Sequence, residues 1–297
     1  MDYGNFFCGI CYVKNMKNFS ELTKEFSSYK TSKIVVLPIP FDKSVSWIKG
    51  AKKGPNAIIE ASGQVELYDI ETDTEVYKQG IFTSQPIKEK TSQKMISQAY
   101  EKTSTFLKDK KFVVTLGGDH SVAIGPIIAH QDFYKNISVL HFDAHADMRN
   151  SYENNKFSHA AVMARVKEKV DNIVSIGIRS MDISEKNSFK RGNLFLANDI
   201  YCAGNKLISQ VVKKLSKKVY LSFDVDVFDS GIMPSTGTPE PGGLNWYQVI
   251  SLIKAVCKTK ELVGMDVVEL APISINKAPD FLVAKLIYKT LSYKFAF

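Results

Sequence analysis

Short, nearly continuous runs of β-branched and apolar residues recur along the whole chain, and segments with helical character follow them. Strands that are buried on both faces have this composition, and they occur mainly in parallel sheets with helical crossovers. We therefore predict an α/β fold with about eight strands. The strong runs are residues 33–37, 112–116, 137–142, 172–176, 219–223 and 262–267, and weaker ones lie near Gly80 and Asn193.

The segments between these runs predict the crossover helices of a doubly wound sheet. They cover residues 55–62, 92–108, 122–129, 159–170, 205–215, 246–256 and 280–293. In such sheets the ligand binds in the crevice beyond the carboxyl ends of the strands. Polar clusters follow several apolar runs directly, so the sequence predicts the functional site at that edge.

The composition predicts one domain without an internal boundary. Of the 297 residues, 44% are hydrophobic and 24% are charged, and no Pro-, Gly- or Ser-rich linker divides the chain. We expect a single unit over residues 1–297, with an N-terminal arm at 1–32 and the core at 33–297.

Charge and cysteine content limit the classes of partner. The net charge of +8 does not indicate nucleic-acid binding, because the basic residues are scattered among acids rather than gathered in a stripe. No apolar run approaches the roughly 18 residues of a membrane span, and the N-terminus lacks a secretion signal, so we expect a soluble cytoplasmic protein. The few cysteines agree with a reducing compartment, and Cys8 and Cys11 are interpreted as free thiols.

The first polar cluster is residues 117–121 (GGDHS), directly after the apolar run at 112–116. Two glycines let the backbone turn sharply and approach a ligand, while Asp119 and His120 arrive at the carboxyl end of the strand. Taken alone, a histidine in such a place more often has a structural role.

The second cluster is residues 141–147 (HFDAHAD). A spacing of two places Asp143, His145 and Asp147 on one side of an extended chain, with small alanines between them. Because neighbouring buried carboxylates are costly unless a cation neutralises them, this pattern favours a metal site over a solvated loop.

The third cluster, residues 222–227 (SFDVDV), again ends an apolar run in carboxylates at a spacing of two. Asp224 and Asp226 are expected to share a face. With His120 and the second cluster they make four carboxylates and two imidazoles, which is more than one ion needs. Two divalent ions with two bridging carboxylates fit this count, and an oxygen-rich set with imidazole suits Mn²⁺ better than structural zinc.

Two more residues complete the predicted site. His159 opens a helix soon after the second cluster, so it can face the ions without serving as a ligand. Glu269 follows the run at 262–267, and a carboxylate at the lip of a metal site can bind a planar guanidinium in a bidentate way. Each of these residues, considered singly, also has an ordinary structural explanation.

The three clusters and Glu269 together resemble the signatures of the ureohydrolase family of arginases and agmatinases, from about Lys33 onward. The resemblance implies an arginase-like α/β/α fold around an eight-stranded parallel sheet and a binuclear manganese centre. It also implies that Asp143 and Asp224 bridge the ions and that the protein forms homo-oligomers, trimers or hexamers. One implied ligand set is His120, Asp143, Asp147 and Asp224, and the other is Asp143, His145, Asp224 and Asp226.

Residues 47–58 and 236–243 resemble the agmatinase branch, so we expect hydrolysis of a small guanidino substrate, agmatine to putrescine, with release of urea. Asp147 would orient the attacking water and relay its proton, His159 would exchange protons with solvent, and Glu269 would hold the guanidinium. Ala160 replaces the Gly of many agmatinases. Arg149 would repel the amine of agmatine unless Glu153 neutralises it.

Three alternatives remain open from the sequence. A related amidinohydrolase acting on guanidinobutyrate, formimidoylglutamate or arginine would explain Arg149 through a substrate carboxylate. A mononuclear zinc deacetylase would not need His120 together with Asp147 and Asp226. A non-catalytic metal-binding member of the fold would not need Glu269.

Overall fold

A sheet of parallel strands forms the centre of the computed structural model, which describes residues 17–44, 47–203 and 205–297. The strands are β1 (Ile34–Ile39), β2 (Ile81–Thr83), β3 (Phe112–Gly117), β4 (Ser138–Phe142), β5 (Asn172–Ile178), β6 (Leu194–Leu196), β7 (Lys218–Asp224) and β8 (Glu261–Val268). Their order across the 8-stranded sheet is β2-β1-β3-β8-β7-β4-β5-β6. Every predicted run, including the two weak ones, forms a strand, so the predicted α/β class is confirmed.

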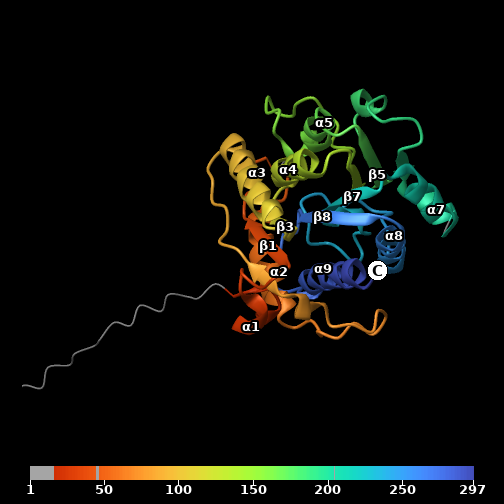
Figure 1. The fold of residues 1–297 in the computed structure, drawn as a ribbon. Coiled ribbons are helices and arrows are strands. Elements are labelled where there is room, and N and C mark those ends of the chain that lie inside the picture. The colour runs from red at the N-terminus through yellow and green to blue at the C-terminus, as the bar shows by residue number, and fades with distance from the viewer. Residues whose placement is uncertain (1–16, 45–46, 204) are drawn as a thin grey trace, which may run out of the picture.

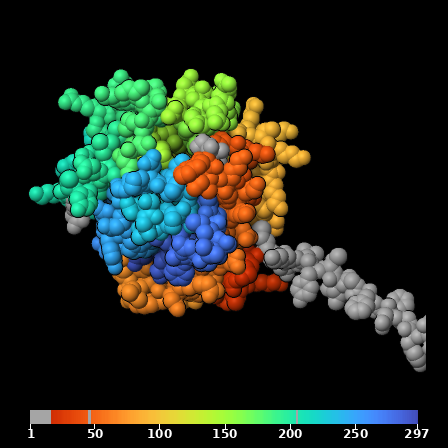
Figure 2. Space-filling view, turned by 180° about the vertical axis from the view of Figure 1, so that it is seen from behind, coloured from red at the N-terminus to blue at the C-terminus, as the bar shows by residue number. Residues whose placement is uncertain are grey.

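Helices cover both faces of the sheet and make it the middle of three layers (Figure 1). On one face lie α3 (Ser92–Lys108), α4 (Ile124–Tyr134) and α5 (Val162–Lys167). On the other lie α2 (Gly54–Ser62), α7 (Asn205–Lys214), α8 (Trp246–Thr259) and α9 (Ala278–Ala296). Figure 2, which views the molecule from behind, shows segments from the first, middle and last parts of the chain side by side on that face.

All the predicted helices are present: α3 has the predicted bounds, and the others have one or both ends shifted. The helix expected at 159–170 is a 3-10 turn at His159–Ala161 followed by α5. Two short helices, α1 (Lys24–Ser27) and α6 (Ala197–Ala203), were not predicted, because such short segments carry too few residues for a periodic pattern. Within the described residues, no helix is both long enough and apolar enough to span a membrane.

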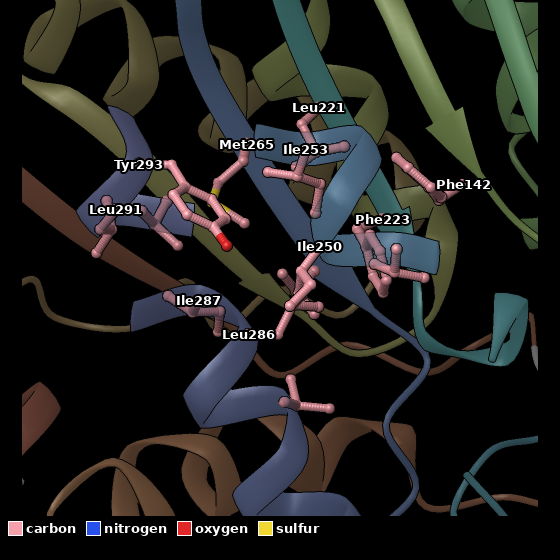
Figure 3. Close-up of a cluster of buried hydrophobic side chains, with 14 of the residues drawn as sticks. Phe142, Leu221, Phe223, Ile250, Ile253, Met265, Leu286, Ile287, Leu291 and Tyr293 are labelled. Carbon is pink, nitrogen blue, oxygen red and sulfur yellow. The ribbon is translucent and has the colours of Figure 1, made fainter. Parts of the chain in front are cut away.

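The largest buried cluster lies where α8 and α9 pack on the central strands (Figure 3). The start of α8 is fixed by a capping box. Asn245 Oδ1 accepts a hydrogen bond from the backbone N–H of Gln248, and Gln248 Oε1 accepts one from the backbone N–H of Asn245. Apolar side chains then face the sheet along the helix. Figure 3 draws Ile250 and Ile253 of α8 with Leu286 and Ile287 of α9 and with Leu221, Phe223 and Met265 of the strands.

The described part of the predicted N-terminal arm packs on this core. Phe19 is 0% exposed and Leu22 8%, and the backbone N–H of Phe19 donates to Thr83 Oγ1 at 2.9 Å. Cys8 and Cys11 lie outside the described residues, so their interpretation as free thiols stays a prediction.

The order of the strands creates a crevice in the middle of the sheet. The chain builds β1, β2 and β3 on one side and β4, β5 and β6 on the other, and β7 and β8 then fill the space between β3 and β4. Parallel sheets bind ligands at such a switch point, beyond the carboxyl ends of the strands.

Candidate metal centre

Four adjacent strands, β3, β8, β7 and β4, carry the predicted site residues to one edge of the sheet. Each of these strands ends beside a polar cluster. Every predicted ligand and catalytic residue lines a single open cavity there, of about 260 Å³. They are His120, Asp143, His145, Asp147, His159, Asp224, Asp226 and Glu269.

A tight backbone contact sets the turn that carries His120. A Cβ atom on Gly118 would lie 1.9 Å from the carbonyl oxygen of Phe41, so only glycine fits at this position. Asp119 then caps the turn, because its carboxylate accepts hydrogen bonds from the backbone N–H groups of Ser121 and Ser44 at 3.1 and 3.0 Å. The close approach at Gly118 is thus to the backbone of Phe41, and the predicted approach to a ligand stays a prediction.

His120 directs one ring nitrogen at three carboxylates. Its Nδ1 lies 3.1 Å from Asp143 Oδ2, 3.1 Å from Asp147 Oδ2 and 3.4 Å from Asp224 Oδ2. It is buried, and among the described residues it has no hydrogen-bond partner of acceptable geometry. The other nitrogen, Nε2, lies 3.1 Å from Ser222 Oγ. An orphaned nitrogen that faces three carboxylate oxygens is the arrangement expected around a cation.

A second imidazole faces a second group of oxygens. Nδ1 of His145 lies 2.9 Å from Asp226 Oδ2 and 3.5 Å from Asp143 Oδ1. Asp143 therefore presents one oxygen to each imidazole, with Oδ2 near His120 and Oδ1 near His145. This is how a carboxylate lies when it bridges two ions.

The carboxylates converge by turns rather than by strand alternation, which corrects the prediction from the spacing of two. β4 ends at Phe142, and Asp147 has a positive φ of 52°, so it lies beyond the extended segment. Asp226 lies in a 3-10 turn whose first N–H groups are capped by Asp224, which accepts from the N–H of Asp226 at 2.9 Å. Capping by aspartate thus favours a turn where alternation predicts an extended chain.

The side chains at the centre carry an excess of negative charge. Burial, followed by the charges of Asp226 and Asp143, holds the pKa of Asp224 well above its usual value. Burial and the charge of Asp119 likewise hold the pKa of Glu269 well above its usual value. In the described part of the chain, no lysine or arginine forms an ion pair with Asp143, Asp147, Asp224 or Asp226. Cations are the groups that would neutralise these acids.

The donor atoms fit a pair of divalent ions. Two groups of potential ligands each lie within 4.8 Å of one another: His120, His141, Asp143 and Asp147 form one, and Asp143, His145 and Asp226 form the other. Asp143 belongs to both. We call the six predicted ligands, His120, Asp143, His145, Asp147, Asp224 and Asp226, the metal cluster. Carboxylate oxygens with imidazole nitrogens suit Mn²⁺ and similar divalent ions, and no thiol is among them.

Glu269 is fixed beside the metal cluster by the turn of His120. Its Oε1 accepts from the backbone N–H of His120 at 2.7 Å, and its own N–H donates to Gly118 O at 2.8 Å. The residue adopts a left-handed conformation with φ of 66°. Among the described residues, Oε2 makes no hydrogen bond, so it is free to accept one from a ligand in the cavity.

His159 lines the cavity without joining either group of potential ligands. Its backbone N–H donates to Ser44 Oγ at 3.0 Å, and its ring lies edge-on to Tyr152, with centroids 5.7 Å apart. The expectation that it faces the site from the start of a helical segment agrees with this position.

Arg149 lies in the outer part of the cavity, and acids other than Glu153 lie beside it. Its guanidinium lies 3.7 Å from Asp182 and 3.9 Å from Glu185, and it stacks on Tyr152 at 5.3 Å. Glu153 does not line the cavity, and no ion pair joins it to Arg149 in the described residues. The prediction that Glu153 neutralises Arg149 was therefore wrong. Asp182 and Glu185 lie beside the guanidinium in its place.

Arg179 joins the turn of Asp226 to the segment at 236–243. Its guanidinium donates only to backbone carbonyls, which include those of Asp226 at 2.7 Å, Glu240 at 2.9 Å and Pro241 at 3.0 Å. Two loops around the metal cluster are thereby held together by one side chain.

Sequence reasoning missed several polar residues that surround the metal cluster. His141 was given no role in the predicted site, although its spacing of two from Asp143 places both residues on one side of an extended chain. Ser222 and Asp266 lie opposite each other on β7 and β8, and Ser222 donates to Asp266 at 3.0 Å. The pairing of β7 with β8, which only the fold reveals, brings these two residues together.

Known proteins are similar to this chain in sequence and in fold. The profile of the arginase family matches residues 32–292. The N(1)-aminopropylagmatine ureohydrolase of Thermus thermophilus is 38% identical over 90% of this chain and 92% of its own. The protein of that name from Synechocystis is 34% identical over 95% of each chain. The crystal structure of the agmatine ureohydrolase of Thermoplasma volcanium has a TM-score of 0.85 and 30% identity over 94% of each chain. The chain therefore belongs to the arginase family, and the resemblance of its motifs to the ureohydrolases is confirmed.

Proposed function

We propose that the protein is a binuclear manganese ureohydrolase that cleaves a guanidino compound to urea and an amine, with agmatine as its substrate and putrescine as its product. The observation that carries the proposal is the position of Asp143, which turns one oxygen toward each of two imidazole nitrogens in the cavity that Glu269 also lines. A pair of divalent ions supplies acidification of water and polarisation of the bond to be cleaved.

The residues of the chain divide the remaining work. Glu269 accepts the guanidinium through Oε2, because Oε1 is held by the backbone of His120. This fixes the guanidinium carbon over the metal cluster and contributes orientation. Asp147 accepts the proton of the attacking water and passes it to the leaving amine, since its carboxylate lies in the cavity beside His120. His159, at the cavity wall, exchanges protons with solvent.

The surroundings of Arg149 support a substrate with a cationic tail. Asp182 and Glu185 both lie beside its guanidinium, so the outer cavity has one basic and two acidic side chains and does not repel an amine. A substrate carboxylate, as in guanidinobutyrate or formimidoylglutamate, would have to compete with two acids for the same arginine. Agmatine is therefore favoured over the anionic alternatives.

N1-aminopropylagmatine is a second candidate substrate. Three relatives that align over 90% or more of this chain are named as ureohydrolases of this compound, and the cavity is open. Its extra amine would extend into the region of Asp182 and Trp47, where the tryptophan is 68% exposed.

Urea release from a panel of compounds tests the proposal. The panel contains agmatine, N1-aminopropylagmatine, arginine, guanidinobutyrate and formimidoylglutamate, each with Mn²⁺ supplied and then chelated. We expect kcat/KM to be highest for one of the first two and activity to vanish on chelation. Preference for an anionic compound would overturn the assignment of the outer cavity, and no turnover of any compound by the loaded protein would favour a non-catalytic role.

A further inference from the structure

His141 occupies a buried position between two strands next to the metal cluster. It lies on β4 at 0% exposure, and its partner across the β4–β5 pairing is Ser175, which is also at 0%. Its Nε2 lies 2.9 Å from Asp143 Oδ2 and its Nδ1 lies 3.1 Å from Ser175 Oγ. Both ring nitrogens are therefore engaged, whereas Nδ1 of the neighbouring His120 has no partner among the described residues.

The direction of these hydrogen bonds follows from the chemistry of the three groups. The ionised carboxylate of Asp143 can only accept, so Nε2 of His141 must carry the proton. A neutral imidazole then has a lone pair on Nδ1, and the Ser175 hydroxyl donates to it. With its proton on the side of Asp143, His141 cannot offer Nε2 to a metal ion. The geometry thus separates it from His120 and His145.

We propose that His141 is a positioning residue, which holds Asp143 in the orientation that turns one carboxylate oxygen toward each ion. The inference rests on the proposed binuclear centre. Asp143 is held from both sides: Oδ1 accepts from the backbone N–H of His145 at 2.5 Å and Oδ2 accepts from His141. Without His141 only Oδ1 keeps a protein donor, and the carboxylate can rotate away from the position between the two imidazoles. Loss of a group that hydrogen-bonds to a metal ligand typically lowers metal affinity by roughly 10- to 100-fold.

Three variants test this role through metal binding. His141→Phe fills the space without a donor, and His141→Gln restores an N–H donor near the position of Nε2. His130→Phe is the matched control, because His130 is also a histidine at 0% exposure but lies on α4, outside the metal cluster. Mn²⁺ affinity is measured by competition with a chelator, the number of imidazoles per ion by X-ray absorption, and kcat and KM by urea release.

We expect His141→Phe to bind Mn²⁺ roughly 10- to 100-fold more weakly with an unchanged imidazole count, and to lose kcat more than KM. His141→Gln should recover most of the affinity, and His130→Phe should keep wild-type affinity whatever its thermal stability. Wild-type affinity in His141→Phe, or no recovery in His141→Gln, would overturn the inference. A lower imidazole count in His141→Phe would instead make His141 a ligand. Failure of the wild-type protein to bind two ions would sink the proposed metal centre itself.

Discussion

Two groups of charged side chains in this molecule are built in opposite ways. The metal cluster gathers carboxylates with no lysine or arginine paired to them in the described residues. The second group, which we call the lysine network, consists of Asp69, Glu71, Lys254 and Lys289. In it Lys289 Nζ lies 2.9 Å from Asp69 and 2.6 Å from Glu71, and Lys254 Nζ lies 2.6 Å from Glu71.

The pKa values of Glu71 in the lysine network and Asp224 in the metal cluster shift in opposite directions. Burial alone would raise the pKa of Glu71, but its hydrogen bonds with Lys254 and Lys289 lower it to about 2. Burial and two neighbouring carboxylates instead raise the pKa of Asp224. The lysine network is complete within the chain and contributes to stability, whereas the metal cluster is complete only with added cations. Buried acids without basic partners therefore mark the functional edge of this fold.

The largest effect is expected from Asp224→Asn, which removes one charge from the metal cluster at nearly constant size. Urea release should fall by about 10³-fold, because loss of a preorganised charge at the reacting centre has this order of effect. The metal-free variant should unfold at a higher temperature than the metal-free wild type, since repulsion with Asp143 and Asp226 is relieved. Urea assays and calorimetry with a chelator measure these two quantities.

Asp69→Asn is the matched control for this change, because it neutralises an acid of the lysine network. It should lower the unfolding temperature and leave kcat at the wild-type value. If Asp224→Asn kept wild-type urea release, or if both variants shifted stability in the same direction, the contrast between the two groups would be wrong.

Lys289→Met should give the largest loss of stability. Lys289 is only 7% exposed, and its removal leaves Asp69, at 2% exposure, without its basic partner. Breaking a buried pair from one side typically costs about 3–5 kcal/mol, which denaturant unfolding can measure. Metal affinity should not change, and an unfolding free energy equal to that of the wild type would show that the network contributes no stability.

The metal-free protein should become more stable as pH falls from about 8 to about 5. Asp224 and Glu269 have raised pKa values, and the charge of Asp226 raises the pKa of His145 to about 12 against the effect of burial. At these three groups the folded chain therefore binds more protons than the unfolded chain in this range, and their stabilisation is lost again as pH rises; His130 opposes them below its usual pKa of 6.5, because burial lowers its pKa to about 4. Glu71 acts oppositely, but only below its usual value of about 4.3, where its stabilisation is lost as pH falls toward 2.

Thermal unfolding at several pH values, with chelator and with excess Mn²⁺, checks this expectation. Bound cations should abolish the rise on acidification, because they neutralise the acids in place of protons. A metal-free protein whose unfolding temperature dropped steadily from pH 8 to pH 5 would contradict the excess of negative charge in the metal cluster.

The smallest effect is expected from Lys254→Gln. The side chain is 31% exposed and Glu71 keeps Lys289, so the loss should stay below about 1 kcal/mol, the usual range for exposed pairs. Denaturant unfolding of the single variants and of Lys254→Gln combined with Lys289→Met would show whether the two lysines act together. A loss as large as that of Lys289→Met would mean that exposure does not weaken this pair.

The metal cluster could be predicted from the sequence because its residues follow apolar strands in short motifs, and the fold class followed from the same strands. The turns at Asp147 and Asp226 could not be predicted, because the alternation of an extended chain and a capped turn both allow the observed spacing. The partners of Arg149 come from residues 182 and 185, and no local pattern connects them to position 149.

The lysine network was not foreseen at all. Its members Asp69 and Lys289 are 220 residues apart, and each reads locally as an ordinary surface charge. Only the packing of the 66–75 loop against α8 and α9 brings them together. Charged residues that stabilise the fold are thus harder to predict from the sequence than those that bind a ligand. The ligand-binding residues follow strand ends in short motifs, whereas the members of the lysine network are far apart in the chain.

Arg179 has a consequence for how the cavity can vary. It holds the loops at Asp226 and at 240–241 through main-chain carbonyls alone, and every residue type provides a carbonyl. The side chains of Thr238 and Glu240, which are only partly buried, can therefore be exchanged, in an evolving or an engineered protein, without removing the carbonyls that hold the segment beside the metal cluster, whereas Gly243 packs against the backbone of Phe228 and cannot. Position 179 itself cannot vary in this way, because the planar guanidinium of Arg179 donates these hydrogen bonds. Changes of specificity are therefore expected in the side chains of the loops and not at Arg179.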